Sequence, residues 1–118
     1  MSKEDYVSRE TYKLLKEKGY DGEFKTCYDI EGYTYPAIHL YDAKKFLREK
    51  HKLFIDITAA MEDYIEDGAV KYKDPYYTWE VFSLEIGETL CFGEAQNVKK
   101  SYEEACESAI KYCLENLI

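Results

Sequence analysis

The sequence lacks any apolar run close to the roughly 20 residues that a helix needs to cross a bilayer. Residues 1–6 also lack the apolar segment of a secretory signal peptide. These absences predict a soluble cytoplasmic protein with no membrane partner.

Glycine, histidine and cysteine are few and widely spaced. The 6 glycines stand singly, so no glycine-rich phosphate-binding loop is present, which argues against nucleotide hydrolysis. No C-x-x-C or H-x-x-x-H pair exists from which a zinc site could start, and the cysteines lack the close spacing of a disulfide scaffold. We therefore expect reduced core thiols, no metal and no cofactor. The cysteines are Cys27, Cys91, Cys106 and Cys113.

Basic residues are outnumbered by acids, 16 to 24, and the formal net charge is −8. Non-specific binding to nucleic acid depends on neutralising phosphates, so we expect no nucleic-acid partner. One segment is an exception, because four bases gather there at helical spacing. They form a candidate anion-binding stripe, although a charged helix face is commonly only solvated. The stripe consists of Lys44, Lys45, Arg48 and Lys52.

Three helices are marked mainly by their ends. The last is predicted to begin after Ser101, because Ser101 followed by Glu104 is a reciprocal capping box and an apolar stripe follows it. The first helix is expected to follow an N-cap at Ser8 and to end before Gly19, which suits a left-handed C′ position. The middle helix is expected over residues 41–50.

Two strand signals come early in the chain. Residues 24–28 and 33–35 are rich in aromatic and β-branched side chains and predict a β-hairpin. Pro36 has no amide to donate, so it marks an edge or the end of regular pairing. Residues 53–58 alternate between apolar and polar side chains, which predicts a strand with one buried face.

A third strand is predicted near residues 77–86. Its apolar residues are odd-numbered up to Val81 and even-numbered from Phe82, so the alternation shifts by one residue at Val81-Phe82. A β-bulge would absorb this slip and turn both halves toward the core, or the strand is buried on both sides. Gly87-Glu88 then predicts a glycine-first hairpin turn that returns through residues 89–92.

Residues 61–75 are acidic and contain Gly68 and Pro75, so we interpret them as a connection that starts with a helical turn over residues 61–66. Four acids gather there without the spacing of a calcium loop, which predicts a solvated face. They are Glu62, Asp63, Glu66 and Asp67.

Tyrosine is abundant, with 13 residues. Its large ring and polar tip suit half-buried sheet faces and interfaces. Tyr76, Tyr77 and Trp79 crowd one stretch and form our candidate interaction surface, with ordinary core packing as the alternative.

Three stretches carry a resemblance to a known family: residues 6–20, 45–51 and 101–105. They contain the helix starts, stops and core spacings described above. In them the chain resembles a family of small uncharacterised proteins from Bacteroides-type gut bacteria and their phages or other mobile elements. Members often carry tryptophan in place of Phe46 and alanine in place of Tyr12. No activity is established for this family, so the resemblance transfers no functional residue.

We therefore expect a single α+β domain over residues 1–118, with a small antiparallel β-sheet and about three α-helices packed mainly on one face. No catalytic constellation is evident, so we expect a non-enzymatic protein–protein interaction protein or an accessory factor of a phage or mobile element. Two alternatives stay open: an acidic nucleic-acid mimic that blocks a DNA-binding protein, and a small hydrolase that pairs Cys27 or Cys91 with a histidine. Homodimerisation through a sheet edge is also open.

Overall fold

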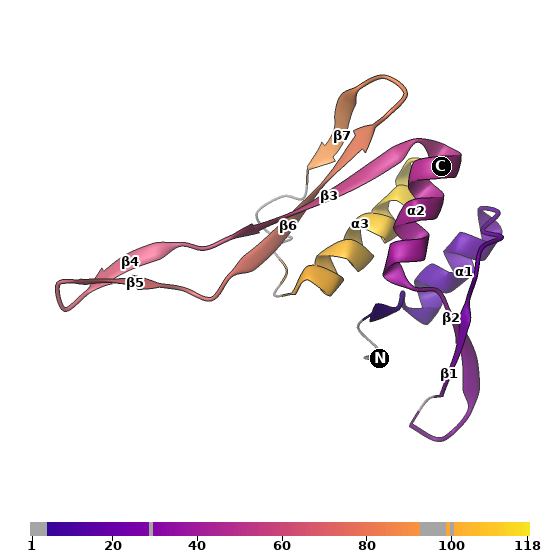
Figure 1. Cartoon of the computed structure of the whole chain (residues 1–118), viewed down its shortest axis with the longest axis horizontal. Coiled ribbons are helices and arrows are strands. Elements are labelled where there is room, and N and C mark those ends of the chain that lie inside the picture. The colour runs from indigo at the N-terminus through magenta and orange to yellow at the C-terminus, as the bar shows by residue number, and fades with distance from the viewer. Residues whose placement is uncertain (1–4, 29, 93–98, 100) are drawn as a thin grey trace.

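The computed structural model describes residues 5–28, 30–92, 99 and 101–118. It has the predicted α+β class, with helices and antiparallel sheets (Figure 1). The elements in chain order are α1 (Arg9–Glu17), β1 (Lys25–Tyr28), β2 (Thr34–Ala37), α2 (Leu40–His51), β3 (Leu53–Ala60), β4 (Asp63–Glu66), β5 (Ala69–Tyr72), β6 (Tyr76–Ser83), β7 (Glu88–Phe92) and α3 (Tyr102–Asn116).

The ends of α1 confirm the predicted caps. Ser8 Oγ accepts a hydrogen bond from the Thr11 amide at 3.2 Å, so it satisfies an amide that has no partner within the helix. Gly19 adopts a φ of +91°, and the Tyr20 amide donates to the Leu15 carbonyl at 2.9 Å. This is the Schellman arrangement, in which a left-handed residue ends the helix.

The other two helices also begin and end close to the predicted residues. His39 caps α2 through Nδ1, which accepts from the Tyr41 amide at 3.2 Å, and Lys52 ends the helix with a φ of +57°. Ser101 Oγ accepts from the Glu104 amide at 3.1 Å, which confirms this half of the predicted capping box on α3.

The early hairpin consists of β1 and β2, paired from Lys25 opposite Ala37 to Tyr28 opposite Thr34. Pro36 lies inside β2, opposite Thr26 in a two-stranded sheet. The prediction of an edge position for this proline is therefore confirmed.

The main sheet is antiparallel, with the order β3-β6-β7. α3 packs against β3 and β6, α2 packs against β3, and α1 packs against α3 and β2 (Figure 1). The alternation predicted for residues 53–58 is confirmed, since Leu53 and Ile55 are buried and Phe54 and Asp56 are exposed. The largest fully buried apolar side chains come from the helices, β6 and the β2–α2 junction: Leu15, Ile38, Leu47, Val81, Ile110 and Leu114.

The bulge is at the predicted step, but the extra residue lies on the neighbouring strand. Val81 pairs with Cys91 and Phe82 pairs with Thr89, so Leu90 of β7 is the extra residue. The side chains of β6 alternate between the two faces of the sheet without interruption, so Phe82 does not face the core.

The end of β6 corrects the related turn prediction. Ser83 is buried, whereas Leu84 and Ile86 are exposed because they belong to a turn over residues 84–87. The Gly87 amide donates to the Ser83 carbonyl at 2.8 Å, and Gly87 has a φ of +70°. Glycine is therefore the last residue of this turn and not the first.

Residues 61–75 form a β-hairpin, so the predicted helical turn over residues 61–66 is wrong. β4 and β5 are joined by Asp67 and Gly68, whose φ angles are +51° and +77°. Two consecutive positive φ angles are typical of the type I′ turn, for which Asp-Gly is a preferred sequence. The predicted acidic cluster is therefore spread along a hairpin, and all of its residues are exposed as expected.

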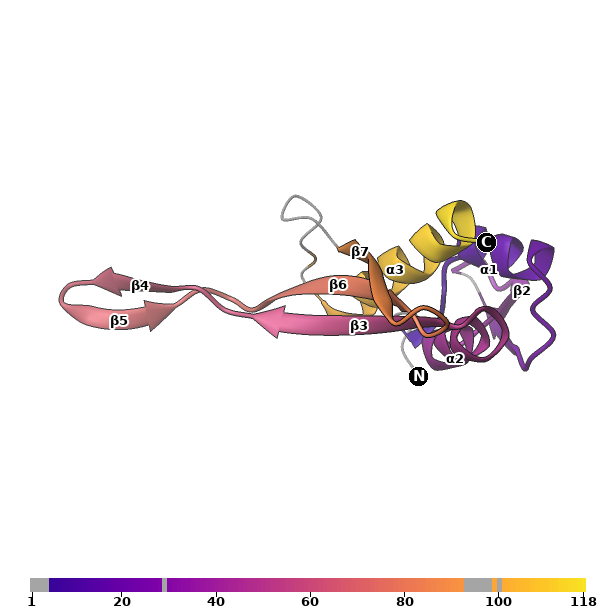
Figure 2. The ribbon, with the colours of Figure 1, turned by 90° about the horizontal axis from the view of Figure 1, so that it is seen from above.

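The β4–β5 hairpin prolongs the β3–β6 ribbon into solvent. The Lys73 amide donates to the Glu62 carbonyl at 2.9 Å, which connects the two pairs of strands. Figure 2 shows this hairpin reaching past the end of α3, and the molecule measures 55 × 44 × 19 Å. At about 3.3 Å per residue, the segment from Ala60 to the hairpin turn projects roughly 20 Å. We call residues 61–75 the arm.

Candidate functional site

One face of the arm is apolar and exposed. Ile65 lies directly opposite Val70, and Tyr72 follows on the same face opposite Asp63. Ile65, Val70 and Tyr72 are 78%, 57% and 65% exposed. We call these three residues the arm apolar face.

The arm apolar face continues the buried face of the main sheet. In β3, Leu53, Ile55 and Ile57 face the helices, because every second side chain of a strand lies on the same face. The same spacing of two residues, continued along the chain, places Ile65 on this face. Between the last β3–β6 pair and the first β4–β5 pair, residues 61–62 lie opposite residues 73–75. The returning strand therefore has one extra residue at this point. Because α3 begins at Tyr102 beside the root of the arm and runs away from it, this part of the apolar face has no helix over it (Figure 2).

The arm carries many acidic side chains; Asp63 shares the arm apolar face, whereas Glu66 lies on the opposite face of the hairpin. Residues 61–75 contain five acids and two bases, a net charge of −3. Glu62 forms an exposed ion pair with Lys73 at 3.2 Å. In the described part of the chain, Asp63, Glu66 and Asp67 have no ion pair. The arm therefore combines an exposed apolar face with a net negative charge.

The predicted aromatic surface is divided between the core and the root of the arm. Trp79 is 3% exposed and packs on Tyr112, with 5.4 Å between the ring centroids, so it lies in the core. Tyr77 is half-buried and meets Tyr102 edge to face. Tyr76 is half-buried at the first pair of β6, beside the arm. Tyr76 is thus the member of this group nearest the arm.

The predicted basic stripe lies on α2 and its end. Lys44 is half-buried and donates to the Tyr102 hydroxyl at 2.9 Å. Lys45, Arg48 and Lys52 form no ion pair with any described residue.

A small cavity of about 120 Å³ lies between α2 and β3 beside this stripe. Two of its lining side chains, Lys44 and Arg48, are cationic, so the cavity combines apolar walls with a basic border. We call it the α2 groove; its lining residues are Tyr41, Lys44, Arg48, Phe54 and Ile55.

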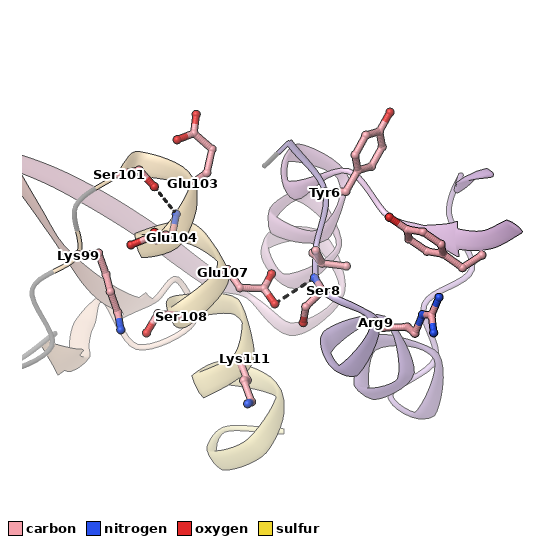
Figure 3. A pocket seen from close by; sticks show the side chains of 12 residues that line it. Tyr6, Ser8, Arg9, Lys99, Ser101, Glu103, Glu104, Glu107, Ser108 and Lys111 are labelled. Carbon is pink, nitrogen blue, oxygen red and sulfur yellow. Dashed lines mark hydrogen bonds between the residues drawn. The ribbon is translucent and has the colours of Figure 1, made fainter. Parts of the chain in front are cut away.

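A larger, open cleft of about 770 Å³ lies between α1 and α3 (Figure 3). Glu107 Oε1 accepts hydrogen bonds from Thr11 Oγ1 at 2.6 Å and from the Ser8 amide at 3.1 Å. The carboxylate therefore joins the start of α1 to the middle of α3, and it lies where the positive end of the α1 dipole favours an anion.

Two other charged groups of this cleft also have partners. Lys111 forms an ion pair with Glu10 at 3.0 Å, and this hydrogen bond raises the pKa of Lys111. The Arg9 guanidinium lies over the Tyr35 ring, 4.9 Å from its centroid. Since Glu107 and Lys111 of α3 both bind residues at the start of α1, we interpret this part of the cleft as a polar contact between α1 and α3.

Two of the cysteines confirm the prediction of core thiols. Cys106 and Cys113 are fully buried on α3, and burial raises the pKa of both thiols, that of Cys113 to about 12. Cys27 and Cys91 are half-buried. Cys91 forms a hydrogen bond with Tyr112, which raises the pKa of that phenol.

Both histidines contact aromatic rings. His39 meets Tyr6 edge to face while it caps α2, and the ring of His51 lies 5.1 Å from that of Phe46. Among the described residues, no group of three or more histidine, cysteine or acidic side chains is placed to hold a metal ion.

Comparison with known protein families, with curated proteins and with solved structures gives no match. Within the described residues, no helix is both long enough and apolar enough to cross a membrane. The arm was not predicted from the sequence, although the Asp67-Gly68 turn between two β-prone segments was the signal that could have located it.

Proposed function

We propose that this chain is a non-enzymatic protein-binding module that contacts its partner through the arm. The exposed arm apolar face is the single observation that carries the proposal. A two-stranded hairpin is at best marginally stable in water. This projecting hairpin exposes three neighbouring apolar side chains, so a partner surface that covers them would stabilise it. The resemblance to proteins of phages and mobile elements makes an accessory factor of such an element our expected setting.

The charge of the arm favours a protein partner. A phosphate backbone would meet a net charge of −3 over residues 61–75, which opposes binding. Aromatic and branched side chains surrounded by polar groups resemble the centre and rim of protein interfaces. The outer edges of β4 and β5 also carry backbone groups to which a partner strand could add.

A capture experiment from a native lysate tests this proposal when it compares three forms of the chain. The arm variant I65T/V70T/Y72T removes the exposed apolar groups but keeps β-branched residues in the strands. The matched control F24T/Y28T/I30T removes three exposed apolar side chains around the β1–β2 hairpin. We expect wild type and control to recover the same stoichiometric partner and the arm variant to lose it. Equal recovery by the arm variant, or loss in the control alone, would contradict the proposal.

A further inference from the structure

We propose that the partner of the arm is the α2 groove of a second copy of this chain, in a reciprocal dimer. This inference rests on the proposed function, since it names the surface that covers the arm apolar face. Each copy would place its own arm on the α2 groove of the other, so the two contacts would be identical by two-fold symmetry.

The charges of the two surfaces are complementary. The α2 groove is lined by two cationic side chains, Lys44 and Arg48, and by no acidic one, whereas the arm carries a net charge of −3. In the described part of the chain, the groove cations Lys44 and Arg48 have no ion pair, and neither do the acids Asp63 and Glu66. Each surface therefore has charges available for a partner of the opposite sign.

The two surfaces cannot meet within one chain. The eight residues of β3 separate the end of α2 from the start of the arm, which is roughly 26 Å of extended strand. Figure 1 shows the arm pointing away from α2. This separation exceeds the Debye length of about 8 Å at physiological ionic strength, so the charges barely interact inside one copy. Only a second molecule can bring these surfaces together.

The α2 groove also offers apolar contact of suitable size. Tyr41 and Phe54 are 59% and 39% exposed at its border. Its volume of about 120 Å³ is close to that of cavities of about 150 Å³ that hold a benzene-sized group, so one side chain fits. Ile65 is the most exposed member of the arm apolar face and is the side chain that we assign to this cavity.

Charge-reversal variants test the arrangement by sedimentation velocity. D63K/E66K reverses two acids of the arm, and K44E/R48E reverses the two cations that line the α2 groove. In the described part of the chain none of these four side chains has an ion pair, and of the four Lys44 alone forms a hydrogen bond, to the Tyr102 hydroxyl. Wild type should sediment with about twice the 13.9 kDa mass of one chain. Each variant alone should be monomeric, with the dimer dissociation constant raised at least about tenfold by like charges. An equimolar mixture of the two variants should restore the dimer, because each arm then meets a groove of opposite charge.

Two matched controls separate this effect from a change in total charge. E17K/E115K and K13E/K25E change the net charge by the same amounts at exposed residues outside both surfaces, and they should dimerise like wild type. Thermal melts show whether each variant is folded.

Three results would overturn the inference: a monomeric wild type, unchanged dimerisation of the folded charge variants, or no dimer in their mixture. A monomeric wild type that still captures a different protein through the arm would overturn the second copy as partner while leaving the proposed function intact.

Discussion

Replacing Glu107 with alanine tests the contact that joins α1 to α3. The Thr11 hydroxyl is fully buried and donates to the Glu107 carboxylate at 2.6 Å, and a hydrogen bond to a charged group contributes about 1.5–3 kcal/mol. The bond from the Ser8 amide at 3.1 Å is exposed, so water replaces much of it. Glu107 Oε2 is buried without a partner among the described residues, and removing it returns about 1 kcal/mol.

The net cost of E107A is therefore about 2 kcal/mol in the free energy of unfolding. A chain of 118 residues has an unfolding entropy of about 0.25 kcal/mol per kelvin, so the melting temperature should fall by about 8 °C. Thermal and urea unfolding followed by circular dichroism measure both quantities. E115A is the matched control, because Glu115 is exposed on the same helix, and it should cost less than about 0.5 kcal/mol.

A double-mutant cycle with T11V isolates the side-chain pair. The double variant E107A/T11V should cost less than the sum of the single variants by about 1–2 kcal/mol, because T11V also removes the hydroxyl that E107A leaves unpaired. Strictly additive costs, or an E107A variant as stable as E115A, would refute the reasoning.

Three further predictions concern the core and the arm. W79F should cost no more than about 1 kcal/mol, because it removes an indole N–H that is buried without a partner among the described residues, whereas W79A should cost about 3–5 kcal/mol; equal costs in urea unfolding would contradict this. Cys106 and Cys113 should resist a thiol reagent at pH 8 in the folded chain and react on unfolding. Because burial raises the pKa of both thiols, their contribution to the free energy of unfolding should be complete below about pH 8.5 and should fall as the pH rises toward 12. Rapid reaction of Cys106 and Cys113 in the folded chain would contradict this prediction, whereas rapid reaction of Cys27 or Cys91 alone would support the cysteine-based hydrolase. G68A should speed amide exchange in the arm while leaving global unfolding nearly unchanged, since a φ of +77° strains alanine; a large global loss would show that the arm supports the core.

Local signals in the sequence predicted the helices and the central strand. Ser8, Gly19 and Ser101 act through hydrogen bonds and backbone angles within a few residues, so their roles follow from neighbouring sequence. The alternation of Leu53 and Ile55 reports which face of β3 is buried, and that needs only the period of a strand.

The arm could not be predicted in the same way, because burial does not impose a pattern on it. Every residue from 61 to 72 is exposed, so apolar and charged side chains follow no alternation tied to a core. Its shape depends on the Asp67-Gly68 turn and on the β3–β6 pairs that precede it. The acidic composition instead favoured an irregular connection.

The position of the aromatic residues was equally beyond local signals. Tyr76, Tyr77 and Trp79 are neighbours in the chain, but only Trp79 is fully covered by α3, whereas Tyr77 is half-buried against Tyr102 at the start of that helix. Whether a strand aromatic is covered depends on where a distant helix ends, which the residues around it do not encode. The extra residue of the bulge, Leu90, was hidden for a similar reason, because register is a property of two strands.

The most direct test of the arm as the binding surface is hydrogen–deuterium exchange of the wild-type chain, alone and in its complex. We expect amides of residues 61–75 to exchange at least about tenfold more slowly in the complex, since a partner that covers the arm suppresses its local opening. Protection confined to the α1–α3 cleft or to the β1–β2 hairpin, with the arm unchanged, would contradict the account.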